Sequence, residues 1–126
     1  MGLADVDGAA PPREIKRLMH PNSLDLKPAD WKLLLELLER YLPATEVWAF
    51  GSRVKGQAKT HSDLDLVAFT EEQSAVSLLK EAFDESSFTI NVDLHRWDEL
   101  PLSFKQNVEQ AYAVVHQSSA QPLHDL

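Results

Sequence analysis

The stretch from Trp48 to Phe69 limits what this chain can fold into more than any other part of it. It opens with three apolar residues that stop abruptly at Gly51-Ser52, a pattern that predicts a buried strand entering a tight turn. After a polar segment, the run from 63 to 69 predicts a second strand with two acids near its start, Asp63 and Asp65. Because side chains alternate along a strand, both acids project to one face of the sheet.

These residue types indicate a nucleotide–metal site. Two neighbouring carboxylates repel each other, and their proximity makes sense if a divalent cation lies between them. Hard oxygen ligands select Mg²⁺, with Mn²⁺ as an alternative. Gly51 lets the backbone come close to a ligand, and Ser52 adds a hydroxyl and an amide where a short helix starts, a favourable place for phosphate. Taken alone, the acid pair also fits a device that keeps a strand edge soluble.

A third acid comes from an independent pattern. Residues 88 to 95 alternate between apolar and polar, which predicts a third strand with one face on helices and one face wet. If the second strand turns its acids to the same wet face, Asp93 lies beside them. His95 belongs to that face too, where the sequence favours a surface position over a contact with the site.

The remaining pattern predicts an α/β fold of the α+β kind, with a small mixed sheet of three to four strands and helices mainly on one face. An amphipathic helix is expected from Pro28 until Pro43, with Leu33 and Leu37 off its apolar stripe, either deeply buried or facing a partner. The stripe itself consists of Trp31, Leu34, Leu35, Leu38 and Tyr41 or Leu42.

Three further elements complete the expected order. A capping box at 70–73 predicts a helix over about 71–84, and a last helix is expected to start near Pro101, with Phe104 on its apolar stripe. Tyr112–His116 fits either an extension of that helix or a short edge strand, and Val114-Val115 favours the strand. Trp48 and Phe50 are expected in the core, whereas Trp97 fits the core and a partner surface equally well.

Composition narrows the class of protein. With 126 residues and no cysteine, the chain fits one domain that buries its own core without disulfides or thiolate metal sites. We expect the domain at 24–117, between tails at 1–23 and 118–126. The net charge of −8 argues against a broad nucleic-acid surface. No apolar run approaches the ~20 residues of a membrane span, and the N-terminus lacks a signal-peptide core, so a cytoplasmic protein is expected.

Ten residues separate Gly51-Ser52 from Asp63, so the stretch has the form G-S, ten residues, D-x-D. In this the chain resembles the minimal nucleotidyltransferases (MNT type) of the polymerase-β-like superfamily, whose signature adds a third acid on a later strand. The resemblance covers roughly residues 24 to 117 and places Asp93 in the third-acid position. It implies transfer of a nucleotide, with ATP as substrate and two Mg²⁺ ions. The metal-binding and catalytic residues would be Asp63, Asp65 and Asp93.

The expected chemistry also gives roles to the glycine–serine turn and to two basic side chains that follow it. Gly51 and Ser52 would hold the β- and γ-phosphates, and Arg53 and Lys55 would offset charge on the leaving pyrophosphate.

The resemblance implies a partner as well. Minimal nucleotidyltransferases commonly pair with a small all-helical protein of the HEPN or substrate-binding type, often as toxin–antitoxin modules, so a hetero-oligomer is expected. In some pairs AMP passes from ATP to a tyrosine of the partner. Two alternatives stay open: a non-catalytic module that masks its partner through Leu33, Leu37 or Trp97, and transfer to a small molecule such as an aminoglycoside. The sequence leaves the base and the acceptor undetermined.

Overall fold

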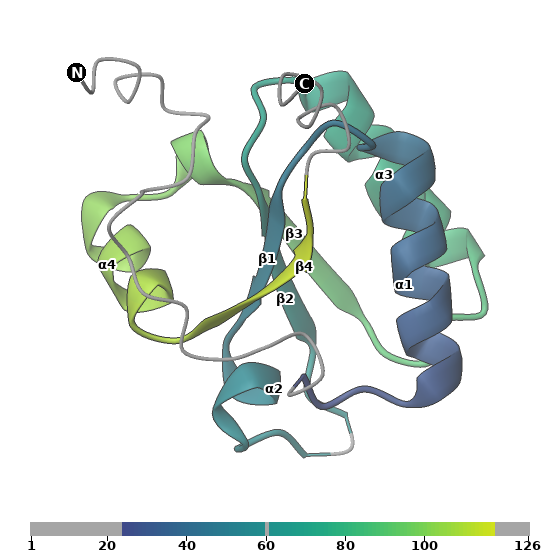
Figure 1. Ribbon diagram of the computed structural model, residues 1–126, viewed down its shortest axis with the longest axis horizontal. Helices are drawn as coiled ribbons and strands as arrows, with labels where there is room; N and C mark the ends of the chain where they lie inside the picture. Colours follow the sequence, from purple (N-terminus) through teal and green to yellow (C-terminus); the bar gives the residue numbers. More distant parts are fainter. Residues whose placement is uncertain (1–23, 60, 118–126) are drawn as a thin grey trace, which may run out of the picture.

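The computed structural model describes residues 24–59 and 61–117. Its centre is a four-stranded sheet in the order β3-β2-β1-β4, shown in Figure 1. The strands are β1 (Val47–Phe50), β2 (Leu64–Ala68), β3 (Val92–Arg96) and β4 (Tyr112–His116). β1 runs antiparallel to β2 and β4, while β2 and β3 are parallel. The mixed sheet confirms the predicted fold class, and Tyr112–His116 is a strand, as the sequence favoured.

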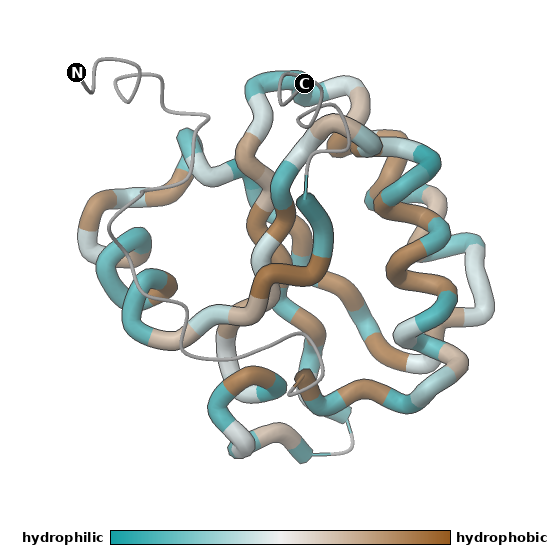
Figure 2. Tube along the Cα trace, in the orientation of Figure 1, coloured by the Kyte–Doolittle hydropathy of each residue, from teal (hydrophilic) through white to brown (hydrophobic). Residues whose placement is uncertain are grey.

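Two helices cover one face of the sheet. They are α1 (Pro28–Tyr41) and α3 (Gln73–Glu85), which lie together on one side of the strands in Figure 1. They bury leucines against inward-facing sheet residues such as Leu64 and Leu66, both 0% exposed. Figure 2 shows that hydrophobic residues recur at intervals along the two helices and along the strands. Burial of this apolar surface is the main force that holds the domain together.

The buried stripe of α1 differs from the predicted one. Leu37 is 9% exposed and Leu33 packs against the core, whereas Leu35 is 43% exposed. The cause is Asp30, which is 2% exposed and whose carboxylate accepts hydrogen bonds from the backbone N–H and the hydroxyl of Thr89. Because Asp30 must face Thr89, the helix turns the residues four, seven and eight positions further along toward the sheet. Of the two alternatives for these residues, burial holds for Leu37, and Leu33 is half-buried against the core.

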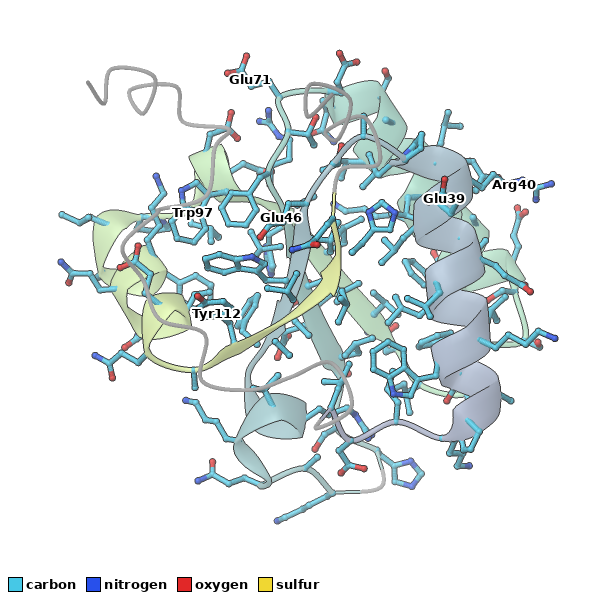
Figure 3. All side chains as sticks on the ribbon, viewed as in Figure 1. Glu39, Arg40, Glu46, Glu71, Trp97 and Tyr112 are labelled. Carbon is cyan, nitrogen blue, oxygen red and sulfur yellow. The ribbon has the colours of Figure 1, made fainter. Side chains whose placement is uncertain are left out.

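The opposite face of the sheet carries a second hydrophobic cluster, under the 3₁₀-helix η3 (Trp97–Glu99) and α4 (Leu102–Gln110). Trp48 stacks on Tyr112 with ring centroids 3.8 Å apart, and Trp97 is 5% exposed. Figure 3 labels Trp97 and Tyr112 on the α4 side of the sheet. The face expected to be wet is thus dry over much of its area, and Trp97 belongs to the core.

Two local predictions were also wrong. The hydroxyl of Thr70 accepts from the N–H of Glu72, and the amide of Gln73 donates to Ser77, so no reciprocal capping box forms and α3 begins only at Gln73. The third strand begins at Val92, because the bond of Thr89 to Asp30 draws the preceding residues toward α1.

The predicted tails, 1–23 and 118–126, lie outside the described residues. Within the described part of the chain, no helix has the length and apolar character to cross a bilayer.

Candidate active site

The strand register brings two of the predicted acids side by side. Asp65 of β2 pairs with Asp93 of β3, and on its other side with Phe50 of β1. The residues on either side of Asp65 and Asp93 pack into the cluster under α1 and α3, so both acids belong to the opposite face. Asp63 is exposed just before β2 begins. Period-two alternation thus predicted the relative placement of Asp65 and Asp93 correctly.

The electrostatics of Asp65 reflect this crowding. Together, burial and the neighbouring charges of Asp93 and Asp63 raise the pKa of its carboxyl from 3.8 to about 6, with burial the largest cause, while His95 lowers it. Like charges held together in a half-buried position are unfavourable unless a cation offsets them. The acid cluster is therefore a place where a divalent cation would relieve an existing repulsion.

His95 lies against the site, contrary to the surface position that the sequence favoured. Its Nε2 is 3.3 Å from Oδ2 of Asp93, and its side chain is 31% exposed. The signal was present in the sequence, because alternation places residues 93 and 95 on the same face. Among residues 24–59 and 61–117, no three histidine or acid side chains are arranged to hold a metal ion as they stand. The three-carboxylate metal site therefore stays a prediction.

Gly51 occupies a position that only glycine fits. Its φ of 85° and ψ of −158° lie in a region that other residues hardly ever adopt. A Cβ built there would lie 2.4 Å from Oδ2 of Asp65, far inside van der Waals contact. The glycine therefore makes room for the carboxylate of Asp65. Ser52 follows as the first residue of the short helix α2 (Ser52–Lys55) and is half-buried.

Arg53 has a different role from the predicted one. Its side chain is 7% exposed, and its guanidinium donates to the carbonyl oxygens of Ser62 (2.9 and 3.0 Å), Asp25 (2.9 Å) and Lys59 (3.3 Å). A guanidinium committed to backbone carbonyls is not positioned to offset charge on pyrophosphate, so we correct that assignment. It instead ties together the segment that leads into Asp63. Lys55 is exposed, and its predicted contact with pyrophosphate stays a prediction.

We expect Arg53→Lys to destabilise the fold by about 2 to 3 kcal/mol, because one ammonium cannot replace a planar fork that reaches three carbonyl groups. Urea unfolding followed by circular dichroism measures the loss. Arg40→Lys, at the exposed end of α1, is the matched control and should change stability little. Equal stability of both variants, with weakened ATP use by Arg53→Lys alone, would restore the pyrophosphate role.

We also expect Asp65→Asn to stabilise the metal-free protein above pH 6. The folded-state pKa of Asp65, about 6, lies above the ordinary value of 3.8, so the folded chain binds more protons between these values. Stability therefore falls as the pH rises from about 4 to about 6. Because Asp65 is only half-buried and solvent screens its charge, we expect Asp65→Asn to raise the free energy of unfolding above pH 6 by roughly 1 to 2 kcal/mol.

Thermal melts at pH 4 and pH 7.5, with chelator present, check this expectation. The gain from Asp65→Asn should be seen at pH 7.5 and should be small at pH 4. Asp84→Asn, which changes an exposed acid on α3, should show no such difference between the two values. Destabilisation of Asp65→Asn at pH 7.5 would contradict the inference that the ionised carboxylate of Asp65 is unfavourable beside Asp93 and Asp63.

Comparison with known proteins agrees with this geometry. Residues 32–121 match the family described as "Polymerase beta, Nucleotidyltransferase", which covers well over half of the chain. The protein belongs to this nucleotidyltransferase family.

Within the family, the chain is 40% identical over 97 residues to the probable protein adenylyltransferase MntA of Haemophilus influenzae. The aligned region covers 75% of this chain and 85% of that protein. The predicted minimal nucleotidyltransferase is thereby confirmed. A crystal structure of a toxin–antitoxin with AMP-PNP superposes with a TM-score of 0.58 at 20% identity, over 71% of this chain and 75% of that chain, and it supports the fold.

Proposed function

We propose that this protein is a Mg²⁺-dependent adenylyltransferase that transfers AMP from ATP to a hydroxyl group of a small helical partner protein, with tyrosine as the acceptor. The pairing of Asp65 with Asp93 beside the Gly51 turn carries the proposal. The similarity to a probable protein adenylyltransferase supports transfer of AMP to a protein. The toxin–antitoxin structure with AMP-PNP supports a nucleotide substrate and a partner, which would meet this protein in the cytoplasm.

The donor chemistry of the site fits the ion, because carboxylate oxygens are the ligands that Mg²⁺ prefers. Asp63 and Asp65 would hold it, and Asp93 would join them once released from His95. The bound metal would neutralise phosphate charge and lower the pKa of the acceptor hydroxyl. Asp93, with a side chain 53% exposed, would face the incoming acceptor and take its proton. The Gly51–Ser52 turn would hold the β- and γ-phosphates, so that pyrophosphate leaves as the acceptor oxygen attacks.

Incubation with α-labelled ATP, Mg²⁺ and the product of the neighbouring gene tests the proposal. We expect label on that product. The label should be absent when all of its tyrosines are changed to phenylalanine together, and also when EDTA replaces Mg²⁺. Label on an aminoglycoside or on RNA in the absence of the partner would show a different acceptor. Label transfer that persists in EDTA would contradict the metal dependence.

The masking alternative loses the surface on which it was based. Leu37 and Trp97 are buried, and Leu33 packs against the core. Neutralisation of a partner through these three residues therefore has no support in the structure.

A further inference from the structure

Three aromatic rings meet beside the acid cluster and are called here the aromatic shelf: Phe50 of β1, His95 of β3 and Phe104 of α4. The ring centroid of Phe104 lies 5.7 Å from that of Phe50, in an edge-to-face arrangement at 84°. The same ring lies 6.3 Å from His95 at 73°, and Phe50 and His95 are also 6.3 Å apart. Rings from three separate elements thus contact one another, with Phe50 buried and Phe104 exposed.

Two residues of the shelf are next to the acids. Phe50 is the cross-strand partner of Asp65, and His95 contacts Asp93 through its Nε2. Phe104 therefore lies over the site from the α4 side of the sheet, against both of the residues that adjoin the acids. A ligand held at Asp65 and Asp93 on this face would meet the ring of Phe104.

Packing of α4 accounts for only part of this arrangement. Val108, on the same helix, is 2% exposed and sits in the second cluster, and Lys105 lies over the ring of Trp97 at 5.4 Å. These contacts hold the helix in place. Phe104 still keeps 36% of its surface exposed, next to a charged site. An open aromatic face at such a place is suited to binding a flat ring from solution.

We propose that the exposed face of Phe104 stacks on the purine base of the nucleotide and so contributes to selection of its substrate. The inference rests on the proposed function, which fixes the triphosphate end at the Gly51–Ser52 turn. That turn directly follows Phe50, which pairs with Asp65 and contacts the ring of Phe104, so a nucleotide that extends from the turn past Asp65 would run toward the shelf. The base is joined to the triphosphate that the Gly51–Ser52 turn would hold, whereas the acceptor would approach at the exposed side chain of Asp93, which favours the base over an acceptor ring as the occupant.

The test compares Mg²⁺·ATP with Mg²⁺·tripolyphosphate, which has no base, by titration calorimetry in the absence of acceptor. We expect Phe104→Ala to weaken ATP binding about tenfold or more, as for loss of one base–aromatic stack, and to leave tripolyphosphate binding unchanged. Phe104→Leu, which keeps apolar volume without a ring, should behave like Phe104→Ala, while Phe104→Trp should retain ATP binding. Leu102→Ala on the same helix, at a residue that is 70% exposed, is the control and should bind both ligands normally.

Each contrary outcome has a distinct meaning. Unchanged ATP affinity in both the Ala and the Leu variants would overturn the inference, as would equal weakening of ATP and tripolyphosphate, which indicates a general disturbance of the site. Normal ATP binding with a raised KM for the acceptor would assign the shelf to the acceptor and overturn stacking on the base. Failure of the wild-type protein to bind either ligand would instead refute the proposed function, and this inference with it.

Discussion

Asp65→Asn is expected to lower the rate of AMP transfer by about a thousandfold or more, because removal of a charged group that acts directly on a transferring phosphoryl centre typically has effects of this size. Asparagine keeps the shape of the side chain and loses its negative charge. It therefore leaves the pairing with Phe50 and Asp93 possible while it weakens the hold on a divalent cation. Asp63→Asn should act in the same direction.

The stability of this variant makes the experiment decisive. Because the pKa of Asp65 is raised to about 6, Asp65→Asn is expected to be at least as stable as the wild type at pH 7.5, and a melting temperature that is not lowered would exclude unfolding as the cause of lost activity. Single-turnover transfer from α-labelled ATP measures the loss, and the melting temperature is read on the same samples. Added Mg²⁺ and ATP should raise the melting temperature of the wild type and not that of the variant.

Non-additivity gives a further check. If Asp63 and Asp65 hold one ion together, the double variant should be about as inactive as either single variant. Asp84→Asn should transfer AMP at the normal rate. Activity of Asp65→Asn within tenfold of the wild type would remove the basis of the proposed function.

The sequence predicted those parts of the fold that depend on short-range periodicity. Alternation along two strands was sufficient to place Asp65 and Asp93 on one face, because neighbouring strands share the orientation of their side chains. The spacing from Gly51 to Asp63 identified the family. These signals are local, and the tertiary structure did not need to be known to interpret them.

The errors arose where a distant residue decided the local structure. The face of α1 is set by the bond between Asp30 and Thr89, which are 59 positions apart, and the same bond delays the start of β3. Arg53 stands next to the Gly51–Ser52 turn in sequence, yet its guanidinium points to the carbonyl of Asp25, 28 positions away. Charge and position along the chain predicted a phosphate ligand at 53, and only the fold shows that this arginine is buried.

The approach of α4 to the acids had no signal in the sequence either. An apolar stripe predicts that a helix packs on something, without indicating on which part of the sheet. The ring of Phe104 was expected merely to help to bury the last helix. Its contacts with Phe50 and His95 bring an aromatic ring to a site that the sequence had described by its charged residues and its Gly51–Ser52 turn.

Gly51→Ala is expected to destabilise the protein by about 3 kcal/mol and to lower AMP transfer by about a hundredfold or more, through two separate effects. The first is the backbone, since φ of 85° with ψ of −158° is essentially restricted to glycine. The second is the added Cβ, which would lie 2.4 Å from Oδ2 of Asp65 and must displace either the carboxylate or the turn. Displacement of either one disturbs the proposed cation and phosphate sites together.

Gly56→Ala separates these effects. Gly56 also has a positive φ, 76°, but its ψ of 20° is in the left-handed helical region, and apart from its two chain neighbours no atom of the described residues lies within 4 Å of its Cβ position. It should lower stability by only about 1 kcal/mol and leave AMP transfer within a few-fold of normal. Urea unfolding and labelled-ATP transfer on both variants measure the contrast.

A double variant then isolates the contact between Gly51 and Asp65. In the background of Asp65→Ala, the carboxylate that the new Cβ meets is gone, so Gly51→Ala should destabilise the protein less than it does in the wild type, by an interaction energy of about 1 kcal/mol or more. Transfer should remain absent in the double variant, because relief of the clash does not restore the acid. If the two substitutions were simply additive in stability, the glycine would be required by the turn alone, and the close approach of Asp65 to its backbone would not explain why no side chain fits at this position.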